Sequence, residues 1–148
     1  MKKLIKAGGK FYRSAGSVAQ QEQIIKVAPK GTLEWFPSEN IIFSGARAQI
    51  QTKIELSHDS NFMGWEISCL GRPASDEYFS KGELDQRFEV WRDGRPLRFE
   101  RLWLKGDNPI LKEKWGLWWR ICSGKAPWWL WLGMASMKIG RASCRERV

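Results

Sequence analysis

The chain has 148 residues, of which 43% are hydrophobic and 28% charged, so it is long enough for one globular domain with its own hydrophobic core. Residues 1–114 carry a net charge of +4 with both signs interspersed, and residues 115–148 carry the other +5. Because no basic stripe or aromatic RNA-binding motif precedes residue 115, the charge pattern argues against nucleic acid as a partner.

Cysteine usage and hydropathy indicate the compartment. The three cysteines are far apart and odd in number, which argues against a disulfide framework or a paired-cysteine zinc site and favours a reducing compartment. The N-terminal residues lack an apolar run long enough for a signal peptide, and the apolar residues 126–137 fall far short of the ~20 residues that span a bilayer. We therefore expect a cytoplasmic protein without a membrane partner.

Residues 48–56, with the sequence AQIQTKIEL, give a clear strand signal after a series of shorter strand-like runs between residues 21 and 47. Apolar and polar residues alternate strictly, which is typical of a half-buried strand in an antiparallel sheet. The expected core-facing residues are Ala48, Ile50, Thr52, Ile54 and Leu56.

Residues 63–75, MGWEISCLGRPAS, begin as a strand and end in a turn. The pattern places Met63, Trp65, Ile67 and Cys69 on one face, which we expect to be buried, with Glu66 on the other. No histidine accompanies the cysteine, so a buried structural thiol is favoured over a nucleophile. The Arg-Pro pair after it ends the strand, since proline cannot donate to a central sheet.

Residues 84–104 predict a β-hairpin, because two strand-like runs flank Asp93-Gly94, a pair suited to a tight turn with positive φ at both positions. The expected core-facing residues are Leu84, Phe88 and Val90 on the first arm and Leu97, Phe99 and Trp103 on the second. No segment shows a helical stripe with caps, so the predicted fold is all-β, with layered or coiled antiparallel sheets built from hairpins.

The sequence offers no set of residues for catalysis. His58 is the only histidine and falls in a predicted turn, and no cysteine pair or phosphate-binding loop is present. The Ser14–Ser17 stretch lacks the spacing of a nucleophile elbow. We therefore expect no catalytic residues, no cofactor-binding residues, no metal ligands and no enzymatic activity.

Four sequence strings, in this order and spacing, carry a family resemblance. They are KFYRSAG (residues 10–16), LEWFPSENIIFSGAR (33–47), WEISCLGRPAS (65–75) and WRDGRPLRFERL (91–102). Together with WGL at residues 115–117, they resemble the urease accessory protein UreD, called UreH in some bacteria, over about residues 8–117.

This resemblance implies an elongated β structure of coiled sheets that acts as a non-catalytic chaperone in urease maturation. It implies apo-urease and UreF as partners, UreG through UreF, and nickel that passes through the complex without a tightly bound cofactor. The motif residues expected to serve as scaffold or partner contacts are Lys10, Phe11, Tyr12, Arg13, Ser14, Glu34, Trp35, Pro37, Arg47, Trp65, Glu66, Arg72, Pro73, Trp91, Arg92, Asp93, Gly94, Arg95 and Glu100.

The resemblance does not extend over the whole chain. We expect residues 1–117 to be a UreD-like β domain that is incomplete at both ends, because members of the family are usually much longer. The Trp-rich residues 118–138 are typical of a frameshifted reading, and residues 139–148 resemble a translated sequencing adapter. The alternative is a small β-sandwich enzyme or ligand-binding protein that stacks carbohydrate on the Trp-rich surface.

Overall fold

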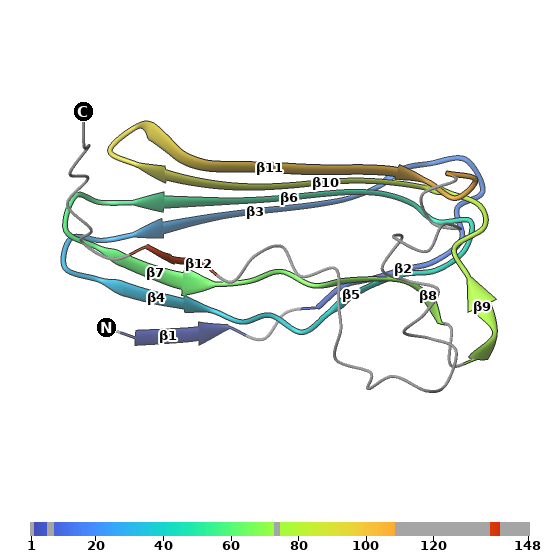
Figure 1. Cartoon of the computed structure of the whole chain (residues 1–148), viewed down its shortest axis with the longest axis horizontal. Coiled ribbons are helices and arrows are strands. Elements are labelled where there is room, and N and C mark those ends of the chain that lie inside the picture. Colours follow the sequence, from blue (N-terminus) through green and yellow to red (C-terminus); the bar gives the residue numbers. More distant parts are fainter. Residues whose placement is uncertain (1, 6–7, 73–74, 109–136, 140–148) are drawn as a thin grey trace, which may run out of the picture.

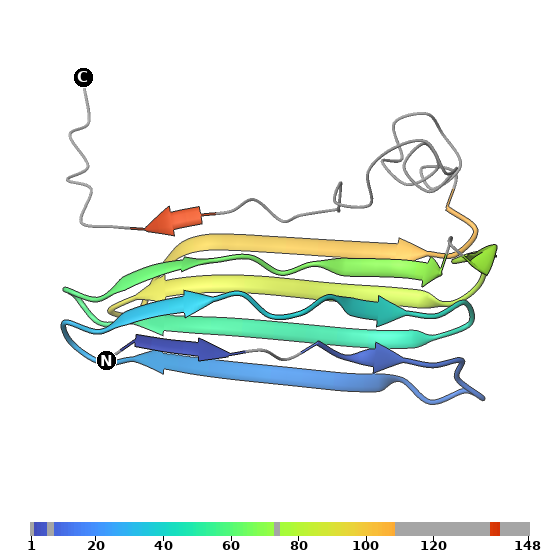
Figure 2. The ribbon, with the colours of Figure 1, turned by 90° about the horizontal axis from the view of Figure 1, so that it is seen from below.

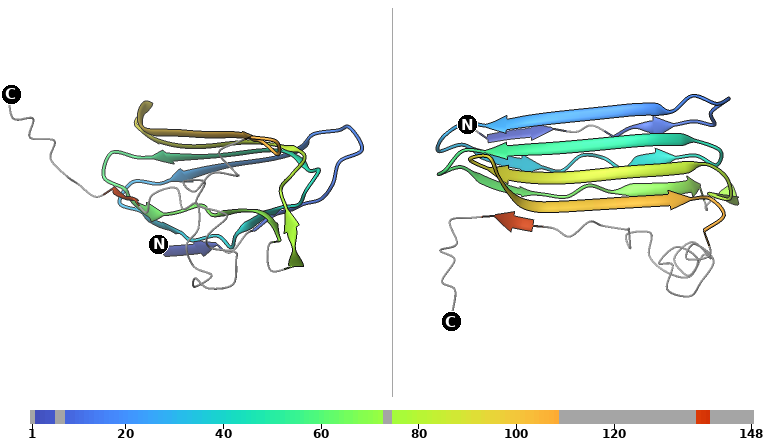
Figure 3. Two further views of the ribbon diagram at one scale, coloured as in Figure 1. Left: turned by 45° about the vertical axis from the view of Figure 1, so that its right-hand side comes forward. Right: turned by 90° about the horizontal axis from the view of Figure 1, so that it is seen from above.

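The computed structural model describes residues 2–5, 8–72, 75–108 and 137–139, and within these residues it contains strands and turns but no α-helix. The strands form two facing layers and run along the long axis of the molecule (Figure 1; Figure 3, left). The expected all-β, layered architecture is therefore confirmed.

One layer is a long four-stranded sheet in the order β11-β10-β6-β3, and the facing layer consists of two shorter sheets placed end to end (Figure 2). The long sheet contains β3 (Ala19–Val27), β6 (Arg47–Leu56), β10 (Glu83–Arg92) and β11 (Arg95–Lys105). The first short sheet contains β1 (Lys2–Ile5), β4 (Thr32–Trp35), β7 (Asn61–Gly64) and β12 (Met137–Ile139). The second contains β2 (Lys10–Phe11), β5 (Asn40–Ile42), β8 (Ser68–Arg72) and β9 (Glu77–Tyr78).

The chain coils between the two layers. It runs along the long sheet as β3 and returns in the facing layer through β4 and β5. It then runs along the long sheet again as β6, returns through β7 and β8, and runs along the long sheet a third time as β10 (Figure 3, right). These three strands lie side by side and run in the same direction, so β6 is parallel to both β3 and β10. The prediction of antiparallel sheets is wrong for these strands, because the chain changes layer at each turn instead of folding back beside itself.

The predicted hairpin between β10 and β11 is confirmed. The two strands are antiparallel, and Arg92 pairs with Arg95 across a two-residue loop. Asp93 and Gly94 have φ values of 47° and 76°. Positive φ at both central positions is the geometry that matches the twist of the flanking strands, and it suits an Asp-Gly pair.

The space between the layers holds two hydrophobic clusters, one toward each end, and β6 contributes to both. Its alternation is as predicted, with Ala48 and Ile50 in the first cluster, Ile54 and Leu56 in the second, and buried Thr52 between them. The first cluster also contains Phe11, Ile42, Ala46, Leu70, Phe79, Leu84 and Leu104. The second also contains Val27, Leu33, Trp35, Phe62, Phe88 and Val90.

In β8 and the residues just before it, the face that packs into the core is the opposite of the one predicted. Glu66, Ser68 and Leu70 are buried between the layers, whereas Trp65 lies on the outer surface with 37% of its area exposed. The prediction that Cys69 is buried is wrong, because its side chain is partly exposed. Both faces of this segment carry apolar residues, so alternation alone does not decide which face is buried. The face that packs against the long sheet is the one that includes Glu66.

The second arm of the hairpin is also rotated relative to the prediction. Leu97, Phe99 and Trp103 are 45%, 59% and 48% exposed. The cause is an irregularity between Val90 and Trp91, beyond which the register of β11 shifts by one residue. A one-residue shift moves every following side chain to the other face of a strand. The buried leucine of this arm is therefore Leu104, which lies in the first hydrophobic cluster.

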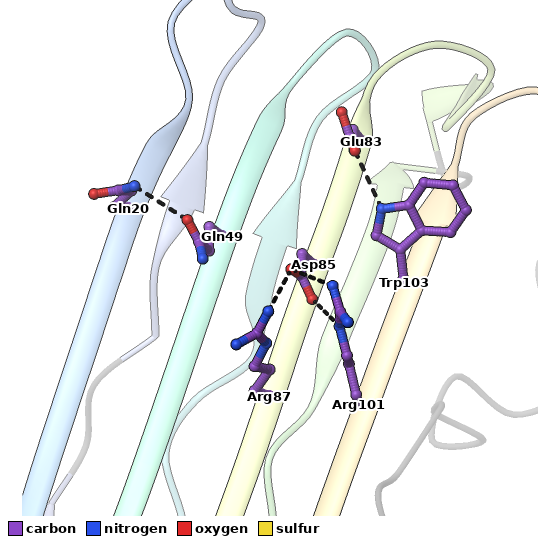
Figure 4. Close-up of polar contacts among 7 residues, drawn as sticks. All are labelled: Gln20, Gln49, Glu83, Asp85, Arg87, Arg101 and Trp103. Atoms are coloured by element: carbon purple, nitrogen blue, oxygen red, sulfur yellow. Dashed lines mark hydrogen bonds and ion pairs between the residues drawn. The ribbon is translucent and has the colours of Figure 1, made fainter.

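The outer face of the long sheet carries polar side chains that pair across neighbouring strands (Figure 4). The Gln20 amide nitrogen donates to the Gln49 amide oxygen at 3.1 Å, and the Trp103 indole nitrogen donates to Glu83 at 3.1 Å. Gln20 and Gln49 are directly opposite each other, and Trp103 and Glu83 are diagonal neighbours; contacts of both kinds add stability to a sheet. This face thus has a polar surface in which aromatic side chains of β11 are set.

Candidate functional site

A buried polar layer separates the two hydrophobic clusters. The Thr52 hydroxyl and the Gln86 amide nitrogen donate to the two carboxylate oxygens of Glu66, and the Ser68 hydroxyl donates to the Gln86 amide oxygen at 2.7 Å. Thr52 lies in β6, Gln86 in β10, Ser68 in β8 and Glu66 in the segment just before β8. Buried polar groups are stable only when they are hydrogen-bonded in this way, so the layer fixes the two sheets relative to each other.

Glu66 is the ionisable group of this layer. Burial raises the pKa of its carboxyl group above the ordinary value of 4.5, because charge is unfavourable away from water. Hydrogen bonds from Thr52 and Gln86 oppose that shift, as does the nearby Trp35 indole. That indole nitrogen is buried without a well-aligned hydrogen bond, so its contribution is the smallest.

A concave pocket of about 580 Å³ opens on the outside of the second short sheet. It is lined by Lys10, Tyr12, Arg13, Ile41, Phe43, Ser44, Arg72 and Glu77. Its lining includes three cationic side chains, one carboxylate and two aromatic rings. The pocket brings together three of the four motifs that carry the family resemblance. The strands β2, β5 and β8, which contribute to its lining, lie at the end of the molecule opposite the turn between β10 and β11 (Figure 1).

The first motif enters the pocket because of its alternation in β2. Phe11 is buried in the core opposite Ile42, so its neighbours Lys10 and Tyr12 point outward. Tyr12 is 64% exposed and stacks on Phe43, with ring centroids 4.8 Å apart and planes 8° from parallel. Lys10 lies beside Ile41 on the outer face, since these two residues are paired in register.

The loop after β2 is held by hydrogen bonds that position Arg13. The Ser14 amide donates to the Gly45 carbonyl at 3.0 Å, and the Gly16 amide donates to the Ser14 hydroxyl at 3.0 Å. The Arg47 guanidinium donates to the Gly16 carbonyl at 2.6 Å. Ser14 and Arg47 are therefore structural residues that shape this wall of the pocket.

Gly45 leaves room for the aliphatic part of the Arg13 side chain. Its φ of +82° lies in the left-handed region, and a Cβ at this position would lie 2.9 Å from Cγ of Arg13. Any other residue would be strained there and would press on the arginine. The glycine of the second motif thus serves the arginine of the first.

Arg72, at the end of β8, lies on Phe43 next to the Tyr12 ring stacked on the same residue, so the three side chains form a row. Its guanidinium carbon lies 5.2 Å from the centroid of the Phe43 ring, and its Nε donates to Glu77 at 3.0 Å. The other Glu77 oxygen accepts the Ser44 amide at 3.3 Å. Glu77 is therefore engaged by Arg72, and no described residue forms an ion pair with Lys10 or Arg13. The pocket has a net positive charge.

The other residues predicted from the motifs do not join the pocket. Trp91, Arg92, Asp93, Gly94 and Arg95 lie at the opposite end of the molecule, where the Trp91 indole donates to Glu89 at 2.8 Å and Arg92 donates to the Ser60 carbonyl at 3.1 Å. Trp35, Pro37 and Glu66 are buried.

The remaining motif residues lie on the surface or outside the described structure. Glu34 lies on the outer face of β4, in the first short sheet. Trp65 follows β7 and is exposed, and its ring centroid lies 4.3 Å from that of Phe36. Glu100 pairs with Arg98 on β11. Pro73 lies outside the described residues, as do the tryptophans of residues 115–131 on which the carbohydrate-binding alternative depends.

Sequence reasoning missed the pocket's floor and its acidic group. Phe43 and Ile41 alternate with buried Ile42, so period two around that residue would have placed both on the outer face. Glu77 joins through β9, whose antiparallel pairing with β8 brings Arg72 beside it. The hydrogen bonds to Glu66 were missed as well, because Thr52 and Gln86 belong to strands 14 and 20 residues away from it in sequence.

Two further observations bear on chemistry. Within residues 8–72 and 75–108, no three His, Cys, Asp or Glu side chains are grouped closely enough to hold a metal ion. No helix in the described part of the chain could cross a membrane.

Comparison with known proteins identifies the family. The sequence model of the UreD urease accessory protein family matches residues 5–132. The chain is 57% identical to a urease accessory protein UreD of Alcanivorax borkumensis over 100 residues, which are 68% of this chain and 33% of that protein. It is 52% identical to the UreD of Citrobacter koseri over 100 residues, or 68% of this chain and 35% of that protein.

A longer match is found with the UreD of Trichormus variabilis, at 40% identity over 129 residues, which are 87% of this chain and 45% of that protein. The chain thus spans between a third and a half of the length of these relatives. The separate origin predicted for residues 118–148 stays a prediction. With the family model matching most of its length, the chain belongs to the UreD urease accessory protein family.

Proposed function

We propose that this chain acts as a non-catalytic scaffold in urease maturation. In this proposal it binds apo-urease and UreF, engages UreG through UreF, and assists the delivery of nickel to the urease active site. It works in the cytoplasm, in keeping with the odd number and wide spacing of its three cysteines. The carrying observation is the match of residues 5–132 to the family of urease accessory proteins.

The geometry supports a binding role in two ways. Two layers clamped by a hydrogen-bonded polar layer make a rigid body, and a rigid surface lowers the entropy lost when a partner binds. Motifs distant in sequence also meet at one exposed pocket, which is lined by arginine and aromatic side chains. These residue types are enriched where proteins contact each other.

Nickel is the cargo of the proposed complex. The layer formed by Thr52, Glu66, Ser68 and Gln86 places oxygen atoms between the sheets, where the rest of the core is largely apolar. A hydrated divalent cation prefers such oxygen atoms to hydrocarbon. This supports passage of the ion past Glu66, in a complex with the partner proteins, and involves no resident metal.

The test is activation of urease in a host that carries the urease genes but lacks its own UreD gene. Supplying the tagged chain should restore nickel in purified urease, measured by atomic emission, and the chain should co-purify with UreF and apo-urease. The matched control is the same host with an empty vector. Urease that is equally nickel-loaded in both hosts, or a tagged chain that captures neither partner, would contradict the proposal.

A further inference from the structure

We propose that the pocket lined by Lys10, Arg13 and Arg72 binds a carboxylate-rich segment of a partner protein. The inference rests on the proposed scaffold function for its biological setting, and it adds the chemistry by which one partner is recognised. Its physical basis is the charge and shape of the pocket, which are independent of that function.

Charge is the first argument. Three cations line the pocket, and the one carboxylate among the lining residues, Glu77, is engaged by Arg72 at 3.0 Å. Lys10 and Arg13 have no ion-pair partner within residues 8–72 and 75–108 and are exposed. Cations without an ion-pair partner in a concave surface attract an anion, and a guanidinium can bind a carboxylate through two parallel hydrogen bonds.

The aromatic floor is the second argument. Tyr12 and Phe43 stack at 4.8 Å, and the Arg72 guanidinium lies 5.2 Å from the Phe43 ring centroid, so Phe43 contacts both neighbours in the row. This arrangement holds the floor in place before any ligand binds. A preformed aromatic surface favours a ligand that has apolar side chains as well as charge.

Size separates a protein segment from a small anion. A volume of about 580 Å³ has room for several amino-acid side chains, which is far more than inorganic phosphate needs. The cations also stand on different walls, Lys10 on β2, Arg13 on the loop after it and Arg72 at the end of β8. Spaced cations match a peptide with several carboxylates better than one compact ion.

The experiment uses the whole chain and a fluorescein-labelled peptide of the sequence Glu-Asp-Phe-Asp-Glu-Asp, with binding followed by anisotropy. The isosteric peptide Gln-Asn-Phe-Asn-Gln-Asn is the neutral probe, and inorganic phosphate is added as a competitor. We expect the acidic peptide to bind at least about tenfold more tightly than the neutral one, and less tightly as salt rises.

The variants locate the binding. Arg13→Glu and Lys10→Glu should each weaken binding of the acidic peptide about tenfold or more. Arg95→Glu, which makes the same change of charge on an exposed residue at the far end of the molecule, should leave it within about twofold. Tyr12→Ala should weaken binding and Tyr12→Phe should preserve it, because phenylalanine keeps the stacked floor.

Each outcome decides the inference. Equal binding of the two peptides, an Arg13→Glu protein that binds as the unchanged chain does, or displacement of the peptide by phosphate at low concentration would overturn it. Near-ultraviolet circular dichroism of each variant excludes loss of folding as the cause. If the chain captures UreF and urease but its pocket variants capture them equally well, the pocket is not the docking site although the scaffold function stands. If the chain captures neither partner, that function fails, and the peptide data still decide the pocket.

Discussion

Arg101 on β11 grips Asp85 on β10 through two parallel contacts, Nε to Oδ1 at 2.8 Å and Nη2 to Oδ2 at 3.0 Å (Figure 4). Arg87 approaches the same carboxylate at 3.4 Å. Arg87 and Arg101 are directly opposite each other in the register of the two strands. Asp85 therefore relieves the repulsion of two like charges as well as forming an ion pair.

Replacing Asp85 with asparagine should lower the free energy of unfolding by about 0.5 to 1 kcal/mol at neutral pH, the range for pairs that are partly open to water. The arginines hold the pKa of the Asp85 carboxyl below its ordinary value of 3.8. The advantage over Asp85→Asn is thus complete above that value and is lost as the pH falls through the lower, folded-state pKa. Urea unfolding at several pH values measures this, with exposed Asp107→Asn as the control. An advantage that persists in acid would contradict the assignment.

Glu66 should give the opposite dependence on pH. Its folded-state pKa is raised above 4.5, so the stability gained by burying the neutral acid is complete below 4.5 and is lost as the pH rises through the raised value. Glu66→Gln keeps a hydrogen-bonding group without the charge. We therefore expect its unfolding free energy to gain on that of the unchanged chain as the pH rises.

The matched control for Glu66 is Glu55→Gln. Lys53 lowers the pKa of Glu55 on the outer face of β6, so the unchanged chain should lead this variant above pH 4.5 and lose that lead in acid. Two glutamate-to-glutamine changes with opposite trends would separate burial from general charge effects. Parallel trends in the two variants would refute the account of the buried layer.

Ile54 tests the alternation of β6. It is fully buried in the second hydrophobic cluster, so Ile54→Ala should lower the free energy of unfolding by about 2 to 5 kcal/mol through lost burial and a cavity. Gln51→Ala, on the outer face of the same strand, should change it by less than about 0.5 kcal/mol. Thermal unfolding followed by circular dichroism compares the two, and equal losses would mean that the strand does not lie in this register.

Gly94 tests the hairpin turn. A Cβ at this position would meet no atom within 4 Å, yet its φ of +76° lies in the left-handed region. Gly94→Ala should therefore cost about 1 kcal/mol through backbone strain alone. Asp93→Asn should be nearly neutral, because asparagine tolerates the same conformation. A fully stable Gly94→Ala protein would show that the turn adopts another geometry in solution.

Local sequence determined the features that depend on neighbouring residues. Strict alternation over residues 48–56 fixed which side chains of β6 are buried, since only one face was apolar. Asp93-Gly94 fixed the hairpin, since few residue pairs accept positive φ twice. The four motifs indicated the family. They did not reveal that three of them would meet at one pocket.

Tertiary structure decided everything that depends on which surfaces meet. The direction of neighbouring strands followed from where the chain re-enters the sheet, which alternation does not encode. Trp65 and Phe99 lie outside because both faces of their strands carry apolar residues. An extra residue in β11, Leu97, which lies between the partners of Val90 and Trp91, then set the phase of that strand. Tyr12, Phe43 and Arg72 became neighbours through the stacking of successive turns of the coil, a contact between residues about 30 positions apart that no local pattern specifies.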